Sequence, residues 1–323
     1  MSRVAEKAES TTVVVAALAA NLGIAAAKFV AAALSGSSSM LTEGVHSVVD
    51  SLNQVLLLWG QHRANRPPDR FHPFGYAREL YFWAFVVAIL IFAVGAGVSV
   101  YEGYRHIVAP EPLHSATLSY VVLGVSALLE GASWTVAVRQ FARTKGDAGW
   151  WQAIRRSKDP ATFIVMFEDS AALAGLLIAA IGVFASHALN LPWVDGAASI
   201  VIGVMLGGVA LLLGRESKGL LIGERADPAV IASIRAIVAG FPQVTAVNHV
   251  RTIHTGPSSV FAAISADFRD DVTMGEAELL VERMEAALRE AEPMLSSIYI
   301  RPERAEDAPR LGPSGDPAAV MSA

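Results

Sequence analysis

The sequence predicts an α-helical membrane protein with six transmembrane helices followed by a small α+β domain. Of its 323 residues, 53% are hydrophobic and only 17% are charged, and the mean hydropathy is +0.45. This composition is too apolar for an ordinary soluble protein of this size. The apolar residues also form six runs that are long enough to cross a bilayer. These runs cover about residues 12–34, 40–59, 80–107, 116–138, 160–187 and 192–213.

After Arg225 the composition becomes that of a soluble domain. Apolar spacing there predicts a helix, two strands, a charged amphipathic helix and a last strand, which together favour an α+β fold of the ferredoxin or metallochaperone type. The final segment is rich in Ala, Pro, Gly and Asp, a composition typical of disorder. We therefore expect a cytoplasmic N-terminus, a transmembrane domain, a cytoplasmic α+β domain and a disordered tail over residues 1–11, 12–214, 215–303 and 304–323.

Lys and Arg are distributed unevenly between the loops of the predicted bundle. They concentrate in the second and fourth loops and after the sixth run, and they are rare in the other three loops. Under the positive-inside rule, the basic loops face the cytoplasm. The sequence thus predicts a multi-pass protein of the cell (inner) membrane, with both termini in the cytoplasm.

Charge and motif content exclude several classes of protein. A net charge of −5 argues against nucleic-acid binding, which needs a basic face. The absence of cysteine excludes disulfides and thiolate ligands, so a metal would have to bind histidine and carboxylate side chains. The sequence contains no nucleotide-binding P-loop and no His-Glu-x-x-His motif, and no Ser/His/Asp pattern supports a hydrolase. We expect no enzyme activity and no resident cofactor.

The second apolar run carries an unusual group of ionisable residues. His46 and Asp50 are separated by four residues, so both lie on one face of a helix, and Glu43 joins that face. Such groups are expensive inside a membrane and usually face a wet cavity or each other. An imidazole and a carboxylate one turn apart can chelate a divalent transition metal. The alternative is a polar helix contact or a proton relay without metal.

Other charged residues also fall inside apolar runs. Lys28 lies in the first run and Glu130 in the fourth, and we expect each to complete a buried ion pair. A proton carrier is the alternative role for Glu130. The fifth run carries the adjacent acids Glu168 and Asp169.

These features together resemble the cation diffusion facilitator family of divalent metal/proton antiporters. The resemblance covers roughly residues 12–303 and rests on the six runs, the His-x-x-x-Asp pair, the acidic fifth run and the α+β domain. It also includes the loop sequence His-Pro-Phe-Gly at residues 72–75, with Asn21, Lys28 and residues 37–41. Members of this family are dimeric secondary transporters that export Zn²⁺, and in some cases Mn²⁺ or Fe²⁺, in exchange for protons.

The resemblance implies specific roles for residues in the membrane. His46 and Asp50 match the metal pair of the second span, and Asp169 matches the aspartate of the fifth span. The family's usual histidine in the fifth span is Val165 here, which has no donor atom, and the neighbouring Glu168 is the predicted replacement, with Glu43 as its competitor. The Phe-Glu-Asp segment of the fifth run resembles the subgroup that contains the mitochondrial animal zinc transporter. A carboxylate is a harder ligand than the imidazole that it replaces. Mn²⁺ and Fe²⁺ are therefore candidate substrates beside Zn²⁺.

The loop after the second run offers a weaker candidate site. Asp69 and His72 match an Asp-x-x-His pair that some family members use for a second zinc ion, but the next expected histidine is Tyr76. Two ligands hold metal weakly. The alternative interpretation is a structural turn that docks against the cytoplasmic domain.

The function implied by the resemblance is proton-coupled efflux of divalent transition-metal cations by alternating access. Its partners would be the metal ions, protons, membrane lipid and a second copy of the chain. The alternative is a transport-inactive membrane assembly or metal-sensor protein built on the same fold.

Overall fold

The computed structural model describes residues 2–110, 116–145, 149–150, 153 and 158–308 of the chain. The chain divides into two compact units, which are described separately. The first comprises residues 1–67 and 79–218, and the second comprises residues 68–78 and 219–323.

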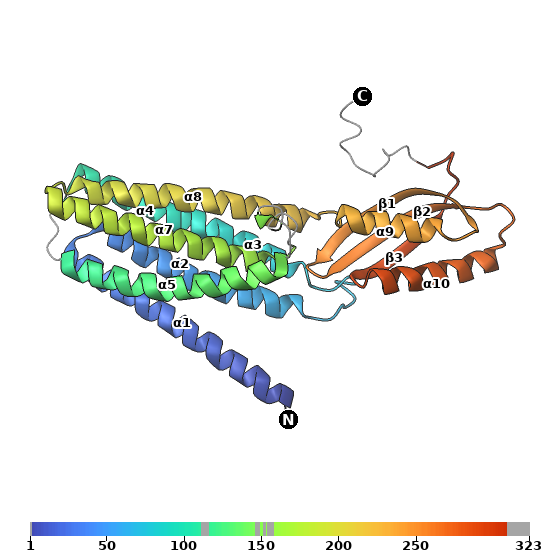
Figure 1. The fold of residues 1–323 in the computed structure, drawn as a ribbon, viewed down its shortest axis with the longest axis horizontal. Coiled ribbons are helices and arrows are strands. Elements are labelled where there is room, and N and C mark those ends of the chain that lie inside the picture. The colour runs from blue at the N-terminus through green and yellow to red at the C-terminus, as the bar shows by residue number, and fades with distance from the viewer. Residues whose placement is uncertain (1, 111–115, 146–148, 151–152, 154–157, 309–323) are drawn as a thin grey trace. The chain divides into compact units, whose positions relative to one another are not determined.

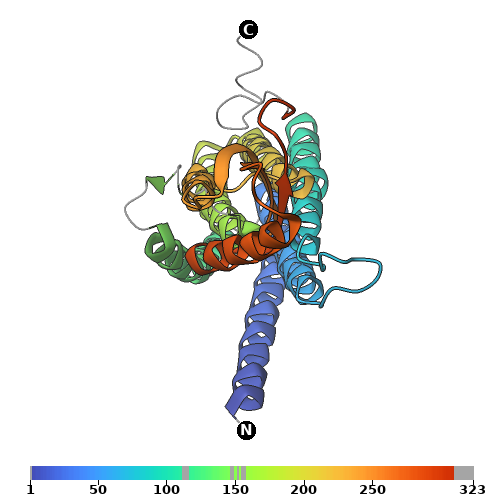
Figure 2. The ribbon, with the colours of Figure 1, turned by 90° about the vertical axis from the view of Figure 1, so that its right-hand side faces the viewer.

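The first unit is a bundle of long helices that lie side by side (Figure 1). Toward its N-terminus, α1 diverges from the other helices (Figures 1 and 2). The third predicted span is a continuous rod of two α-helices joined by a short π-helix, in which Ser99 Oγ donates to the carbonyl of Gly95 at 2.5 Å. The helices are α1 (Ser2–Ser35), α2 (Ser38–Ala64), α3 (Glu79–Leu90), η1 (Ile91–Ala96), α4 (Gly97–Val108), α5 (Ala116–Lys145), α7 (Pro160–Leu189) and α8 (Trp193–Ile222).

Within the described residues, four helices are long and apolar enough to cross a membrane. They are Glu79–Val108, Thr117–Arg143, Phe163–Leu189 and Trp193–Ile222. α2 falls below this measure because it carries a polar stripe, and that stripe is buried inside the bundle, including Glu43, His46 and Asn53. A helical transmembrane domain followed by an α+β domain confirms the predicted fold class.

The helices extend beyond the predicted spans. α1 begins at Ser2 rather than at residue 12, so residues 2–11 belong to the same helix as the first predicted span, and α8 continues to Ile222. Apolar runs indicate only the length that a helix spends in hydrocarbon, whereas the backbone hydrogen bonds continue through polar turns. The unit boundary consequently falls after residue 218 instead of 214. Of the predicted disordered tail, residues 304–308 form a turn, and residues 309–323 lie outside the described part of the chain.

The second unit contains the predicted order of helix, two strands, helix and strand. The three strands pair in the order β1-β2-β3, antiparallel and then parallel. Both helices pack on one face of this sheet, where Ile234, Ile264 and Leu280 belong to a single buried core. A capping box of Thr273 and Glu276 starts the second helix. The elements are α9 (Pro228–Ala239), β1 (Val244–Gly256), β2 (Ser259–Phe268), α10 (Met274–Ala291) and β3 (Leu295–Pro302).

Residues 68–78 pack against this sheet, although they lie far from it in the sequence. Phe74 meets Phe261 of β2 edge-to-face, with ring centroids 5.7 Å apart. Ala77 lies so close to Gly256 that a Cβ atom at that glycine would stand 2.6 Å from the alanine Cβ. The loop is therefore part of the α+β unit, as the structural-turn interpretation expects.

A buried aspartate joins the first turns of two bundle helices. Asp195 of α8 accepts hydrogen bonds from the backbone N–H groups of Ser38 and Ser39, at 2.5 and 3.2 Å. Its other oxygen accepts from the hydroxyls of Ser37 and Ser39, at 2.9 and 2.5 Å. The carboxylate thus caps the N-terminus of α2 from a different helix, where it also meets the positive end of the helix dipole.

We expect Asp195→Ala to destabilise the bundle by on the order of 3 kcal/mol, because buried N–H and O–H groups would lose a charged acceptor. The measurement is thermal unfolding of the purified protein in detergent. The matched control is Glu102→Ala, which removes a surface carboxylate 3.4 Å from Arg105 on α4. Such exposed pairs contribute about 0–1 kcal/mol. Equal losses in the two variants would show that Asp195 is not a structural cap.

Candidate metal centre

The central helix α2 places the predicted pair of the second span one turn apart. His46 Nε2 lies 3.4 Å from Asp50 Oδ2. The imidazole is buried, and neither ring nitrogen has a hydrogen-bond partner in the described residues. Asp50 Oδ1 is likewise without such a partner. These unpaired donor atoms are unusual in a protein interior, and they are what a metal or proton site requires.

The helix α7 brings both predicted acids to the same place. Glu168 accepts a hydrogen bond from Asn53 Nδ2 at 2.6 Å, and Asp169 accepts one from Ser133 Oγ at 3.0 Å. Although the two acids are neighbours in sequence and about 100° apart around the helix, both line one cavity. Val165 also lines it, so the position where the family usually has histidine does face the site.

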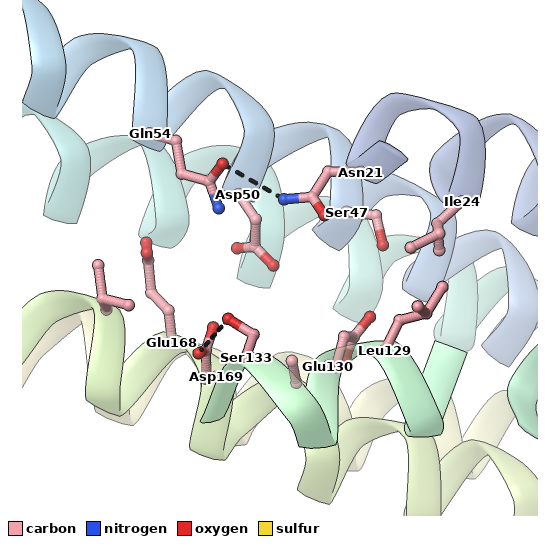
Figure 3. Close-up of a pocket in the computed structure, with 12 residues that line it drawn as sticks. Asn21, Ile24, Ser47, Asp50, Gln54, Leu129, Glu130, Ser133, Glu168 and Asp169 are labelled. Carbon is pink, nitrogen blue, oxygen red and sulfur yellow. Dashed lines mark hydrogen bonds between the residues drawn. The ribbon is translucent and has the colours of Figure 1, made fainter. Parts of the chain in front are cut away.

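This cavity has a volume of about 170 Å³ and lies between α1, α2, α5 and α7 (Figure 3). Asp50 enters it from α2, and Glu168, Asp169 and Glu130 enter it from the opposite side. His46, although 3.4 Å from Asp50, is not one of the described lining residues. The described lining residues are Asn21, Ile24, Ser47, Asp50, Gln54, Leu129, Glu130, Ser133, Val165, Glu168, Asp169 and Ala172.

The predicted ligands share the cavity region without converging on one point. Across the described residues, no group of three or more His, Asp or Glu side chains is close enough to hold a metal ion. The structure thus brings Asp50, Glu168 and Asp169 to one cavity, and His46 contacts Asp50 without being one of the described lining residues. A cation bound there would have to draw these side chains together.

Glu43, the competing candidate for the fourth ligand, pairs with a lysine instead of lining the cavity. Its Oε2 accepts from Lys28 Nζ at 3.1 Å, and the same ammonium reaches Glu130 Oε1 at 2.9 Å and Ser47 Oγ at 2.9 Å. Glu43 is not among the described cavity residues. The buried pairing expected for Lys28 and Glu130 is present, and Glu43 is its third member.

Two polar residues that hold the acids of the site by hydrogen bonds were not predicted. Asn53 fixes Glu168, and Ser133 fixes Asp169. Asn and Ser carry no charge, so neither stands out in an apolar run as an isolated Asp or Glu does. Helical spacing was the available signal, because Asn53 is three residues after Asp50 and Ser133 is three residues after Glu130.

The loop pair is organised as a turn. Asp69 Oδ1 accepts from the backbone N–H groups of Phe71 and His72, at 2.9 and 2.7 Å, and Oδ2 accepts from the Tyr76 hydroxyl at 2.7 Å. These hydrogen bonds, that from Tyr76 foremost, lower the pKa of Asp69 below its ordinary value. His72 Nδ1 lies 3.5 Å from Asp69, and both side chains are largely exposed. Because both carboxylate oxygens already accept hydrogen bonds, this geometry favours the structural-turn interpretation over a second metal site.

An apolar helical bundle with carboxylates around an internal cavity, followed by an α+β domain, defines a class of multi-pass membrane protein that handles cations. Comparison with known proteins gives the family. Residues 14–222 match the cation efflux transmembrane domain, and residues 226–305 match the cytoplasmic domain of cation efflux proteins. The chain belongs to the cation efflux family, also called the cation diffusion facilitators.

Several relatives are similar over most of this chain. The proton-coupled zinc antiporter SLC30A9, mitochondrial, of Xenopus laevis is 33% identical over 244 residues, which cover 75% of this chain and 44% of the relative. Metal tolerance protein C4 of Arabidopsis thaliana is 34% identical over 269 residues, or 82% and 58% of the two chains. The manganese efflux system protein MneP of Bacillus subtilis is 24% identical over 257 residues, or 76% and 80%. The chain spans about half the length of the first two relatives.

Proposed function

We propose that this protein exports divalent transition-metal cations from the cytoplasm in exchange for protons. The observation that carries the proposal is the cavity inside an apolar bundle, which Asp50, Glu168 and Asp169 line and where Asp50 lies 3.4 Å from His46. Ionisable groups inside a membrane domain are expensive and usually mark an ion pathway. Relatives named as a zinc antiporter and as a manganese efflux protein support the same conclusion.

Competition between protons and metal at this site supplies the coupling. A metal ion needs a neutral imidazole and ionised carboxylates, so its binding excludes protons from His46, Asp50 and Asp169. Protons arriving from the opposite side bind the same groups and displace the metal. Alternation of the cavity between the two membrane faces then converts a proton gradient into metal export. The distribution of Lys and Arg between the loops supports cytoplasmic termini, and the cell (inner) membrane is the location that we propose.

The donor set can accept Zn²⁺, which we propose as the main substrate, and leaves Mn²⁺ and Fe²⁺ open. With Val165 in the cavity wall, the site offers one imidazole and the carboxylates of Asp50, Glu168 and Asp169. Zn²⁺ accepts four such nitrogen and oxygen ligands, whereas Mn²⁺ and Fe²⁺ accept more oxygen ligands and water.

We expect Asp50→Ala and Asp169→Ala each to abolish metal transport without unfolding the protein. Each carboxylate supplies charge to the cation, and neither is needed for the helix that carries it. The measurement is uptake of Zn²⁺, Mn²⁺ and Fe²⁺ into proteoliposomes under a pH gradient, together with a size-exclusion profile.

Glu102→Gln is the control for that experiment, since Glu102 pairs with Arg105 at the helix surface. Normal flux in either aspartate variant would remove that residue from the site. Metal binding without flux in the unaltered protein would instead support a transport-inactive sensor or assembly protein.

Glu168→Gln tests the fourth ligand. Asn53 can still donate to the glutamine carbonyl, so the local packing is retained, but the charge is lost. We expect metal affinity to fall about tenfold or more, and Val165→His in that background to restore Zn²⁺ binding more than Mn²⁺ binding, because imidazole suits Zn²⁺ better. Calorimetric titration measures both. Unchanged affinity in Glu168→Gln, with loss in Glu43→Gln, would transfer the ligand role to Glu43.

We further propose that the protein is a homodimer in which the α+β units pair through the open face of the sheet. This face carries Phe261, whose ring centroid lies 5.4 Å from that of Tyr299. Tyr299 is 60% exposed, and the neighbouring loop residues Phe71 and Phe74 are exposed too. Exposed aromatic clusters of this kind are typical of interaction surfaces.

Tyr299→Asp should therefore weaken dimerisation, because it places a charge within the apolar interface. The matched control is Leu279→Asp on α10, which alters an equally exposed apolar residue outside that face. Light scattering of the full chain in detergent measures the mass of each variant. A monomeric unaltered protein, or equal weakening in both variants, would count against this interface.

A further inference from the structure

The ammonium group of Lys28 is enclosed by three side chains from two other helices. Its Nζ lies within 3.1 Å of an oxygen of Glu43 and of Glu130, and it also donates to Ser47 at 2.9 Å. These three acceptors use all the protons of an ammonium group. Lys28 and Glu43 are both 0% exposed. With one cation against two carboxylates, the cluster has one more acid than it needs for charge balance.

The two acids of this cluster differ in what their second oxygen meets. The free oxygen of Glu43 lies against Gly175 of α7, where an added Cβ atom would stand only 2.5 Å away. Glu130 is one of the residues that line the cavity, and its side chain is 18% exposed. Its Oε2 is itself buried and has no hydrogen-bond partner in the described part of the chain. Glu130 is therefore the member of the cluster that opens onto the cavity.

Helix α5 presents a second polar group on the same face. Ser133 lies one turn after Glu130 and donates to Asp169 Oδ2 at 3.0 Å. Figure 3 shows Glu130 and Ser133 side by side in the cavity wall, across from Asp50. A cation held by Asp50 and Asp169 would thus be bordered by α5 as well as by α2 and α7.

We propose that Glu130 is a further ligand of the transport site. Its Oε2 enters the coordination shell of a divalent cation in the cavity, while its Oε1 stays on Lys28. This inference rests on the proposed function. Lys28 then acts as a positioning residue, since it holds the glutamate side chain toward the cavity and joins α1 to the occupied site. The competing interpretation is that Glu130 only balances the charge of Lys28.

Glu130→Gln separates the two interpretations because it is expected to fold. The amide oxygen still accepts from Lys28, and Lys28 and Glu43 remain as a balanced pair. We expect the purified full-length variant to bind Zn²⁺ and Mn²⁺ about tenfold more weakly by calorimetric titration at fixed pH, with an unchanged unfolding temperature. With Co²⁺ as a probe, its visible absorption should change, because the spectrum reports the set of ligands. Glu102→Gln is the charge-matched control and should behave as the unaltered protein.

A double variant, Lys28→Met with Glu130→Gln, gives the decisive comparison. If Glu130 is a ligand, metal affinity stays low in the double variant; if it only balances charge, removal of the lysine restores affinity and overturns the inference. Affinity and Co²⁺ spectrum equal to those of the unaltered protein in Glu130→Gln would also overturn it.

Asp169→Ala distinguishes failure of this inference from failure of the proposed function. Loss of binding there with normal binding in Glu130→Gln defeats only the inference, whereas no binding by the unaltered protein defeats the proposed function with it.

Discussion

The structure of the bundle depends on how it accommodates charge in an apolar interior. A buried ion must find an opposite charge, a full set of hydrogen bonds or water. The bundle uses all three solutions: Lys28 pairs with two acids, Asp195 accepts four hydrogen bonds, and Asp50 faces a cavity. Because α2 takes part in each of these arrangements, its polar side chains determine where the other helices pack against it.

The same constraint divides the acids of the bundle into two kinds. Asp195 and Glu43 are not among the described cavity residues. Asp195 has partners for both oxygens. Glu43 pairs with Lys28, while its other oxygen, which has no hydrogen-bond partner in the described residues, lies against Gly175. We assign both acids to holding helices together. Asp50 and Glu130 line the cavity, and each keeps one oxygen without a hydrogen-bond partner among the described residues. Such unsatisfied groups cost stability unless a ligand, water or proton completes them. A site that must both bind and release its ion therefore lowers the stability of the ion-free protein. Asp195 and Glu43 offset this loss, because they hold helices together outside the cavity.

Sequence reasoning could predict the fold class, the α+β order and that Asp50, Glu168 and Asp169 lie near one another, because apolar runs and isolated charges are visible along one chain. It could not place the residues that act through contacts between helices. The role of Asp195 depends on three serines more than 150 positions away, and that of Asn53 depends on α7. Helix ends were also misplaced, since hydropathy does not report where backbone hydrogen bonding ceases.

The Asp195 cap has a mechanical consequence for α2. It fixes one end of a rigid rod, whereas the site lies further along that rod. At a rise of 1.5 Å per residue, Asp50 is about 18 Å from the capped end, so a tilt of about 3° about this fulcrum displaces its carboxylate by about 1 Å. Coordination bonds tolerate only about 0.2 Å. The cap would therefore act as the pivot for such a tilt, and in the proposed transport site a rotation of this size would be enough to move the Asp50 carboxylate into or out of contact with a cation.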